Sequence, residues 1–189
     1  MTVSMRLAIE PKNSYHLINH GPCNLITTGD GTRQNVAPIN WTMPLNNDPP
    51  LMMTVLENGI YTDILAKETR EFTINLMSEP HAQAVLACGR YHGNKVNKFE
   101  KFGLHAMPGK SVKAPFLKES LGHIECQVIG SHPYEGVNLY VGKVVYAEVE
   151  ESVWDGKGLI IEKAKTIHHV TAGTFAISER VVTVQKPVI

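Results

Sequence analysis

The segment at residues 33–42, RQNVAPINWT, combines an extended-chain pattern with side chains that hydrogen-bond and stack. Asn35, Asn40, Trp41 and Thr42 stand where a strand that only filled a core would carry Val and Ile. Pro38 has no N–H to give to a ladder, so this strand is expected to be an edge, bulged or partly unpaired. Backbone amides left unpaired beside two Asn side chains and an indole face can bind a planar, hydrogen-bonding heterocycle.

Strand alternation divides the segment into two faces. The first holds Asn35, Ala37, Ile39 and Trp41, and the second holds Val36, Pro38, Asn40 and Thr42. A structural alternative remains open, in which the amides satisfy loop backbone and Trp41 is a core residue.

A phosphate site is predicted close by. Thr62 follows the apolar run 51–57 and stands at a predicted helix start, as a plausible N-cap. A helix amino end offers free N–H groups and a partial positive charge, and a Thr hydroxyl can bind the same anion. Lys98 would add a full charge. The alternatives are a plain helix cap and a solvated surface lysine.

The elements that position these residues are mostly strands. Alternating or continuous apolar runs predict strands at 23–29, 33–42, 51–57, 71–76, 124–134 and 137–151, with weaker candidates at 158–162 and 174–179. Asp30-Gly31 and Glu135-Gly136 are the predicted hairpin turns.

Predicted helices are few and short. They cover 61–69, 78–89 with Ser78 as N-cap and Gly89 past the end, and 94–104. Many strands with small helices at the connections indicate a mainly β chain, a β-barrel with helical inserts, over the single domain 1–189.

Composition narrows the function classes. The chain has 189 residues with 18 Lys plus Arg and 18 Asp plus Glu, so its formal net charge is zero and nucleic acid is not the expected partner. The amino end shows no signal-peptide pattern and no run approaches the roughly 18 apolar residues of a membrane span, so no membrane association is expected. Three widely spaced cysteines predict buried thiols in a reducing cytoplasm rather than a disulfide framework.

Several familiar motifs are missing. The sequence holds no GxGxxG before a helix, no GxxxxGK[ST] and no GxSxG, so a nucleotide would have to be held by other means. His16 and His20, and the adjacent His168 and His169, suggest a metal at first sight. The first pair runs into Gly21-Pro22, and neighbours in a strand point to opposite faces, so no metal site is predicted.

The order and spacing of short motifs resemble a known family. The motifs are Thr27-Thr28, the glycine turn 29–31, Asn35 to Ala37, Asp48-Pro49-Pro50, Thr62, the segment EFTIN at 71–75, NKFEKFGL at 97–104, APFLKESLGHIECQV at 114–128 and LYVGKVV at 139–145. Together they resemble the flavin reductase-like FMN-binding proteins of split-barrel fold, which include flavoredoxins. The resemblance covers roughly residues 10–180, with Asn97 where the family usually has Asp.

The resemblance implies one FMN per subunit, bound near the interface of a homodimer. It assigns the strand 35–42 to the isoalloxazine, Thr62 and the backbone before it to the phosphate, and Lys98 to the phosphate or the flavin edge. His132 and Phe175 would close the site, with a partner subunit as one source. The implied cofactor-binding residues are Asn35, Val36, Ala37, Pro38, Asn40, Trp41, Thr42, Thr62, Lys98, His132 and Phe175.

Three functions remain open at the level of sequence. The first is a reductase in which NADH or NADPH is a transient electron donor. The second is a flavoredoxin-type carrier that keeps its FMN and exchanges electrons with a redox protein partner. The third is a split-barrel protein for haem or another flavin. The flavin would supply the electron chemistry, so no catalytic residue is named.

Overall fold

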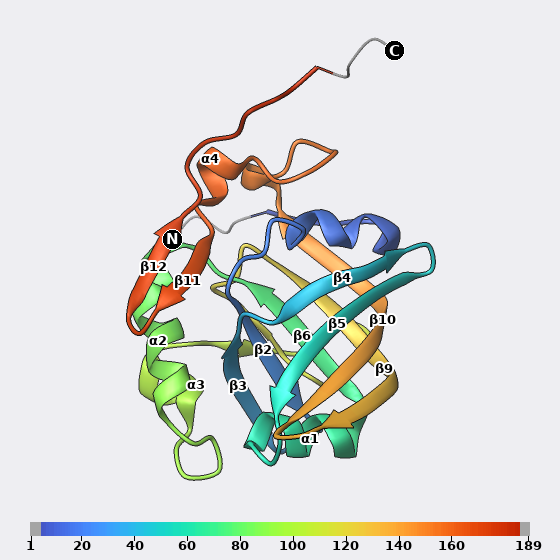
Figure 1. Ribbon diagram of the computed structural model, residues 1–189, viewed down its shortest axis with the longest axis vertical. Helices are drawn as coiled ribbons and strands as arrows, with labels where there is room; N and C mark the ends of the chain where they lie inside the picture. Colours follow the sequence, from blue (N-terminus) through green and yellow to red (C-terminus); the bar gives the residue numbers. More distant parts are fainter. Residues whose placement is uncertain (1–4, 186–189) are drawn as a thin grey trace.

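The computed structural model describes residues 5–185 as a split β-barrel with small helices around it (Figure 1). The barrel sheet is antiparallel throughout and its main path runs β3-β2-β6-β9-β10-β5-β4, with β1 paired to β10. Its strands are β1 Arg6–Ala8, β2 Asn24–Gly29, β3 Gln34–Ile39, β4 Thr42–Asn47, β5 Pro50–Glu57, β6 Glu71–Leu76, β9 Gly122–Tyr134 and β10 Val137–Glu150. Two small pairs stand apart, β7 Ala106–Met107 with β8 Phe116–Leu117, and β11 Ile167–Thr171 with β12 Thr174–Ile177.

The two edges of this sheet are consecutive in the chain, and this makes the barrel split. β3 ends at Ile39 and β4 begins at Thr42, at opposite ends of the strand order. Between them Trp41 turns its carbonyl toward β5 and accepts the Val55 N–H at 2.9 Å. The prediction of one strand over 33–42 is therefore wrong at its carboxyl end. Asn40 and Trp41 mark the opening where the chain passes from one edge to the other.

The barrel interior is a packed apolar core. Phe72, Ile74 and Tyr140 are among its fully buried members. A Cβ on Gly142 would lie 2.6 Å from the Phe72 ring, so the ring occupies the space that a side chain would need. The helix α1 (Tyr61–Thr69) crosses one end of the barrel, and the 3-10 helix η1 (Pro11–Leu17) lies near the other (Figure 1).

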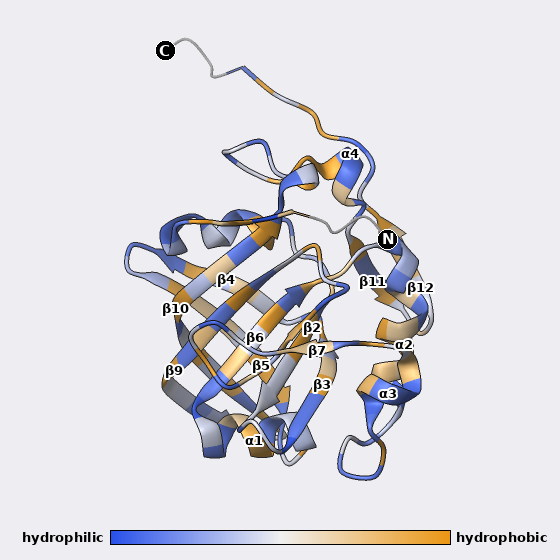
Figure 2. Cartoon of the chain, turned by 180° about the vertical axis from the view of Figure 1, so that it is seen from behind, coloured by the Kyte–Doolittle hydropathy of each residue, from blue (hydrophilic) through white to orange (hydrophobic). Residues whose placement is uncertain are grey.

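A second apolar layer covers the outer side of β2 and β3. It contains the 3-10 helix η2 (Glu79–His81), α2 (Ala82–Arg90), α3 (Lys98–Phe102) and the β11–β12 hairpin. Leu25 and Val36 of the sheet pack with Val85, Cys88 and Phe99 of the helices. The short helices η3 (Glu151–Val153) and α4 (Ile161–Ala164) follow β10. In Figure 2 the strands alternate between hydrophobic and hydrophilic colours, as expected when one face of each strand is buried.

Most predicted elements are confirmed. The structure has the hairpins at Asp30-Gly31 and Glu135-Gly136, and the bounds of α1 and β6 match the predictions 61–69 and 71–76. The strand predicted at 158–162 is wrong, because Leu159 makes only an isolated bridge to Trp154 and a helix starts at Ile161.

The predicted helix ends need four corrections. The N-cap of α1 is Ile60, so Thr62 is the second helical residue. Gly89 lies inside α2, which ends at Arg90. Ser78 caps η2 without a side-chain hydrogen bond. The helix predicted over 94–104 shortens to α3, where Asn97 accepts the Glu100 N–H at 3.4 Å.

A buried carboxylate fixes α1 to the barrel wall. Asp63 accepts hydrogen bonds from Tyr140 Oη at 2.5 Å, Asn138 Nδ2 at 2.9 Å, Lys67 Nζ at 2.8 Å and the Gly59 N–H at 2.9 Å. Burial alone would raise the pKa of this carboxyl, but the hydrogen bonds together hold the pKa below its usual value. The amino end of α1 is therefore held in one position relative to β10.

A second buried carboxylate holds the segment 105–113, which matches no motif of the sequence. Glu125 of β9 accepts the N–H groups of Lys110 at 2.7 Å, Ser111 at 2.6 Å and Val112 at 3.2 Å, and lies 3.3 Å from His123 Nε2. Burial opposes its charge, but His123 and the backbone donors hold the pKa of Glu125 below its usual value. The segment is therefore anchored to β9 of the barrel sheet.

The three cysteines are unpaired and buried. Burial raises the pKa of Cys23 to about 12 and that of Cys88 to about 11, and it raises the pKa of Cys126 further. Within residues 5–185, the helices are too short or too polar to cross a membrane.

Candidate functional site

Three adjoining cavities follow the open edge of β3, and Pro38 lines all of them. The α1-side cavity, of about 230 Å³, lies between β3, the start of α1 and the loop after α2. The hairpin cavity, of about 270 Å³, lies between α2 and the β11–β12 hairpin. The gap cavity, of about 450 Å³, opens where β3 passes into β4. We call the three together the β3 groove. Its size suits a small molecule or cofactor.

The α1-side cavity joins two of the predicted residues. Asn35 Nδ2 donates to Thr62 Oγ1 at 2.8 Å, and both side chains are buried. Because this hydroxyl oxygen accepts from Asn35, its own proton is available to a ligand. Thr62 also lies in the first turn of α1, where the helix dipole favours an anion. A Cβ on Gly93 would lie 1.9 Å from Asn35 Oδ1, so the loop covers Asn35 this closely only with glycine.

Lys98 is a buried residue, and its ammonium group is mostly occupied by the protein itself. It is 5% exposed, and Nζ donates to the Val36 carbonyl at 2.9 Å and to the Cys88 carbonyl at 2.7 Å. Burial lowers its pKa. One N–H remains for a ligand in the α1-side cavity, which Lys98 lines. Since N–H and C=O of one strand residue point the same way, the Val36 N–H also faces the open edge.

Thr28 is a polar residue of the same region that sequence reasoning did not select. It is the cross-strand neighbour of Asn35 and is fully buried, yet its hydroxyl has no hydrogen-bond partner among residues 5–185. Buried hydroxyls are almost always paired, so Thr28 is an exception, but it lines none of the three cavities. The Asp30-Gly31 turn fixes the register that places Thr28 opposite Asn35.

The gap cavity contains the indole. Trp41 lines it and is 69% exposed, so it is a wall residue and not the core residue of the alternative reading. Asn40 Nδ2 lies 3.0 Å from His169 Nδ1, and His169 Nε2 lies 3.1 Å from the Ala172 carbonyl. This chain of bonds holds the β11–β12 turn against the opening of the barrel. His169 is therefore a further groove residue.

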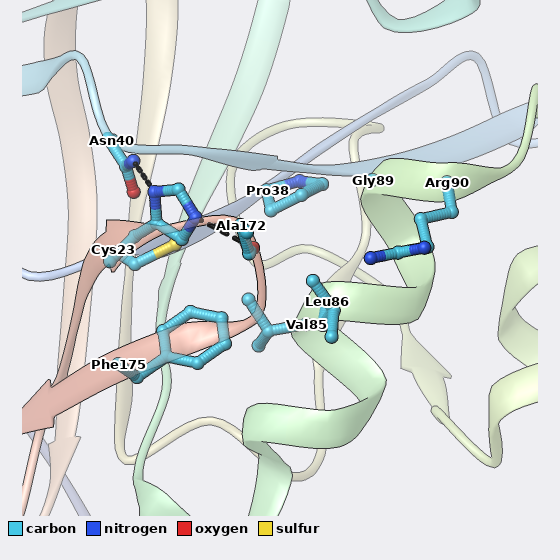
Figure 3. A pocket seen from close by; sticks show the side chains of 10 residues that line it. Cys23, Pro38, Asn40, Val85, Leu86, Gly89, Arg90, Ala172 and Phe175 are labelled. Carbon is cyan, nitrogen blue, oxygen red and sulfur yellow. Dashed lines mark hydrogen bonds between the residues drawn. The ribbon is translucent and has the colours of Figure 1, made fainter.

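The hairpin cavity is apolar in the middle and polar at its ends (Figure 3). Val85 and Leu86 of α2 face Phe175 of β12, with Asn40 at one end and Arg90 at the other. Arg90 lines both this cavity and the α1-side cavity, and no carboxylate of residues 5–185 lies within salt-bridge distance of it. Sequence reasoning missed Arg90, because a terminal helix residue gives no pattern of its own.

The remaining predicted residues lie in different surroundings, and only some of them line the β3 groove. Ala37 lines the α1-side cavity, whereas Thr42 is buried and bonds to Thr54 Oγ1 at 2.9 Å. His132 lies exposed on β9 and lines none of the three cavities, so its contribution stays a prediction. His20 bonds to Thr166 Oγ1 at 2.7 Å, and among residues 5–185 no three His, Cys, Asp or Glu side chains are grouped to hold a metal.

Comparison with known proteins agrees with this fold. Residues 18–164 match the family model described as the flavin reductase like domain. The chain belongs to this family, whose members are flavin-related oxidoreductases.

Individual relatives cover nearly the whole chain. The uncharacterized protein YddH of Escherichia coli K12 is 29% identical over 187 residues, which is 96% of this chain and 99% of that protein. The structure is similar to an FMN-binding domain of a flavin reductases-like enzyme from Shewanella baltica OS155, with a TM-score of 0.90, 19% identity and coverage of 98% and 100%. It is also similar to the flavoredoxin of Desulfovibrio vulgaris (Miyazaki F), with a TM-score of 0.79, 24% identity and coverage of 86% and 89%.

Proposed function

We propose that the protein binds FMN in the β3 groove and acts as an oxidoreductase through it. The observation that carries this proposal is the α1-side cavity, where the Asn35–Thr62 pair, Lys98 and the amino end of α1 line one space. These groups donate hydrogen bonds, which the phosphate and the ribityl hydroxyl oxygens of FMN can accept. The family match supports a flavin as the ligand.

The groove offers separate groups to each part of FMN. Thr62, Arg90 and the third N–H of Lys98 would hold the phosphate. Glu57 lines both the α1-side and gap cavities, and its carboxylate can accept from ribityl hydroxyls between them. The backbone of β3, with Asn40 and Trp41, would hold the isoalloxazine in the gap cavity. When bound, the flavin supplies hydride or single-electron chemistry.

We propose NADH or NADPH as the electron donor. The hairpin cavity supports a small-molecule partner, because it adjoins the two cavities assigned to FMN and combines an apolar middle with Asn40 and Arg90 at its ends. The alternative is a flavoredoxin-type carrier that receives its electrons from a protein. Anaerobic addition of NADH or NADPH to the FMN-loaded protein distinguishes the two. Rapid loss of the flavin absorbance is expected, and an oxidised spectrum that persists with both nucleotides would contradict the reductase proposal.

We also propose a homodimer, supported by an unpartnered apolar face of the barrel. Met43 pairs with Met53, and Met53 pairs with Val141 across the sheet. Seven outer positions of β4, β5 and β10 carry apolar side chains that are partly exposed, and we call them the outer sheet face: Met43, Leu45, Leu51, Met53, Val55, Leu139 and Val141. Patches of this kind mark interaction sites, and zero net charge does not oppose self-association. The three unpaired cysteines are consistent with the predicted cytoplasmic location.

The FMN site is tested by replacing the Thr62 hydroxyl. Thr62→Val keeps the shape of the side chain but removes the donor, so FMN affinity should fall roughly 10- to 100-fold, the value of one hydrogen bond to a charged group. Trp41→Ala should also weaken binding. Thr69→Val is the matched control, because Thr69 lies at the far end of α1 and bonds to the Leu65 carbonyl. Flavin fluorescence titration measures all three, and wild-type affinity in both groove variants would refute the site.

A further inference from the structure

A short loop joins α2 to α3 and forms part of the wall of the α1-side cavity. It covers residues 91–97, and we call it the α2–α3 loop. In Figure 1 it projects from the two helices. Tyr91, His92 and Gly93 line the cavity, and the following residues Asn94 and Lys95 are exposed. The loop therefore has one side toward the cavity and the other toward solvent.

The two ends of the α2–α3 loop are fixed to each other. Lys98, the first residue of α3, donates to the Cys88 carbonyl in the last turn of α2 at 2.7 Å. The ring centres of Tyr91 and Phe102 are 5.3 Å apart, and Lys101 Nζ lies 4.6 Å from the centre of the Tyr91 ring. Compact surface loops whose ends are held close together are often functional. With this base in place, the tip is the part of the loop that can move.

The tip is hydrogen-bonded to itself and rests on the barrel at Gly93. The N–H groups of Lys95 and Val96 both bond to the His92 carbonyl, at 3.0 and 3.2 Å. A Cβ on Gly93 would lie 1.9 Å from Asn35 Oδ1 and 2.8 Å from Asn35 Nδ2, so the backbone of the tip packs directly on this carboxamide. A tip that closes its own turn can leave the barrel and keep these hydrogen bonds.

The side chains beneath the tip are those that the proposed function assigns to the polar end of FMN. Asn35, Thr62 and Lys98 are buried, yet all three line the α1-side cavity. A phosphate bound to them would lie under the α2–α3 loop. The tip would therefore have to move outward before the phosphate could pass from these groups into solvent.

We propose that the α2–α3 loop is a lid over the phosphate end of the flavin site, and that its opening sets the rate at which FMN leaves. This inference rests on the FMN site of the proposed function and adds the element that controls exchange of the cofactor. The base held by Lys98 is the hinge. Gly93 is the residue that lets the tip close onto Asn35.

Gly93→Ala tests the lid, because the added methyl group cannot share the space of the Asn35 carboxamide. The tip should stay raised, and the dissociation rate of FMN should increase roughly 10-fold or more. Gly158→Ala is the matched control, because a Cβ there meets no atom within 4 Å. Flavin fluorescence after dilution follows the release of FMN. A wild-type rate for Gly93→Ala would overturn the lid, whereas a wild-type protein that binds no FMN would overturn the proposed function itself.

The same substitution in an Asn35→Ala background tests where the lid closes. Asn35→Ala removes the carboxamide, so the methyl group of Gly93→Ala then has room. Adding Gly93→Ala to Asn35→Ala should therefore change the dissociation rate of FMN by less than about 2-fold. An equal increase in both backgrounds would overturn Asn35 as the surface on which the tip closes.

Hydrogen exchange separates opening of the lid from a mere displacement of Asn35. Binding of FMN should slow amide exchange in residues 91–97 of the wild type, and it should slow it much less in Gly93→Ala. The turn at 155–158 lines none of the three cavities and serves as the internal control. Exchange in residues 91–97 that is the same with and without FMN in the wild type would overturn the proposal. Equal slowing in the wild type and in Gly93→Ala would also overturn it.

Discussion

The barrel wall and the β3 groove differ in how fully their polar side chains are hydrogen-bonded within the protein. Inside the barrel wall, Asp63 and Glu125 have several short hydrogen bonds each, and the space around Phe72 is filled up to Gly142. Along the groove, Lys98 has one ammonium N–H left and Arg90 has no carboxylate partner among the described residues. Asp63 and Glu125 use their hydrogen-bonding capacity within the fold. Side chains that line a cavity and keep unused capacity are the ones to assign to a ligand.

The largest effect is expected from the interior core. Phe72→Ala removes a fully buried ring and leaves a cavity that Gly142 cannot fill, so the free energy of unfolding should fall by about 3–5 kcal/mol. Urea unfolding measures the change. Tyr134→Ala, at a residue that is 63% exposed, should change it by less than about 0.5 kcal/mol. A loss below about 1 kcal/mol for Phe72→Ala would show that the interior is not closely packed.

The Asp63 network comes next. Asp63→Ala removes the buried carboxylate that accepts from Tyr140 and Asn138, so the free energy of unfolding should fall by about 2–3 kcal/mol. Glu68→Ala, which removes only an exposed ion pair with Arg33, should cost about 0–1 kcal/mol. The lowered pKa of Asp63 means that its stabilisation is complete above the unfolded value of about 3.9 and is lost as the pH falls through the lower folded value. The free energy of unfolding of the wild type and of Asp63→Ala, measured against pH, should therefore differ in slope only below about pH 4.

Two adjacent threonines test the comparison directly, because their hydroxyls have opposite bonding. Thr27 accepts from Asn75 Nδ2 at 3.0 Å and donates to the Pro115 carbonyl, while Thr28 has no partner in the described chain. Thr27→Val should destabilise the flavin-free protein by about 1–2 kcal/mol. Thr28→Val should leave it unchanged or stabilise it by up to about 1 kcal/mol, because no hydrogen bond is lost.

Thermal unfolding of the two flavin-free variants measures the difference. If Thr28→Val destabilised the protein as much as Thr27→Val, the Thr28 hydroxyl would have a partner within the fold.

The smallest effect is expected at the junction of η1 and the β11–β12 hairpin. Burial, with a contribution from the nearby His168, lowers the pKa of His20 to about 4, against about 6.5 in an unfolded chain. Between these values the unfolded chain binds more protons, so stability should fall as the pH drops from about 6.5 toward 4. Because the site is partly exposed, the free energy of unfolding should fall by less than about 1 kcal/mol at pH 5.5. His20→Gln should flatten this part of the stability profile, and an unchanged profile would assign the acid sensitivity to other groups.

The sequence predicted the parts of the fold that depend on local pattern. Alternation and turn residues located the hairpins, and the bounds of α1 and β6 were confirmed. β4 was missed because Pro44 and the two asparagines 46–47 hide its pattern. The groove residues Asn35 and Thr62 were predicted and do meet, at 2.8 Å. Arg90 was missed, because a spare guanidinium is a property of the surroundings and not of the sequence pattern.

Two of the three buried thiols lie beside the groove, with Cys88 lining the α1-side cavity and Cys23 the hairpin cavity. Peroxide and alkylating agents attack the thiolate form of cysteine, and a raised pKa leaves almost none of it near neutral pH. If electrons escape from the bound cofactor to dissolved oxygen, the oxidant forms next to sulfur atoms that are slow to react with it. Such a molecule should survive aerobic turnover without a thiol-protecting partner.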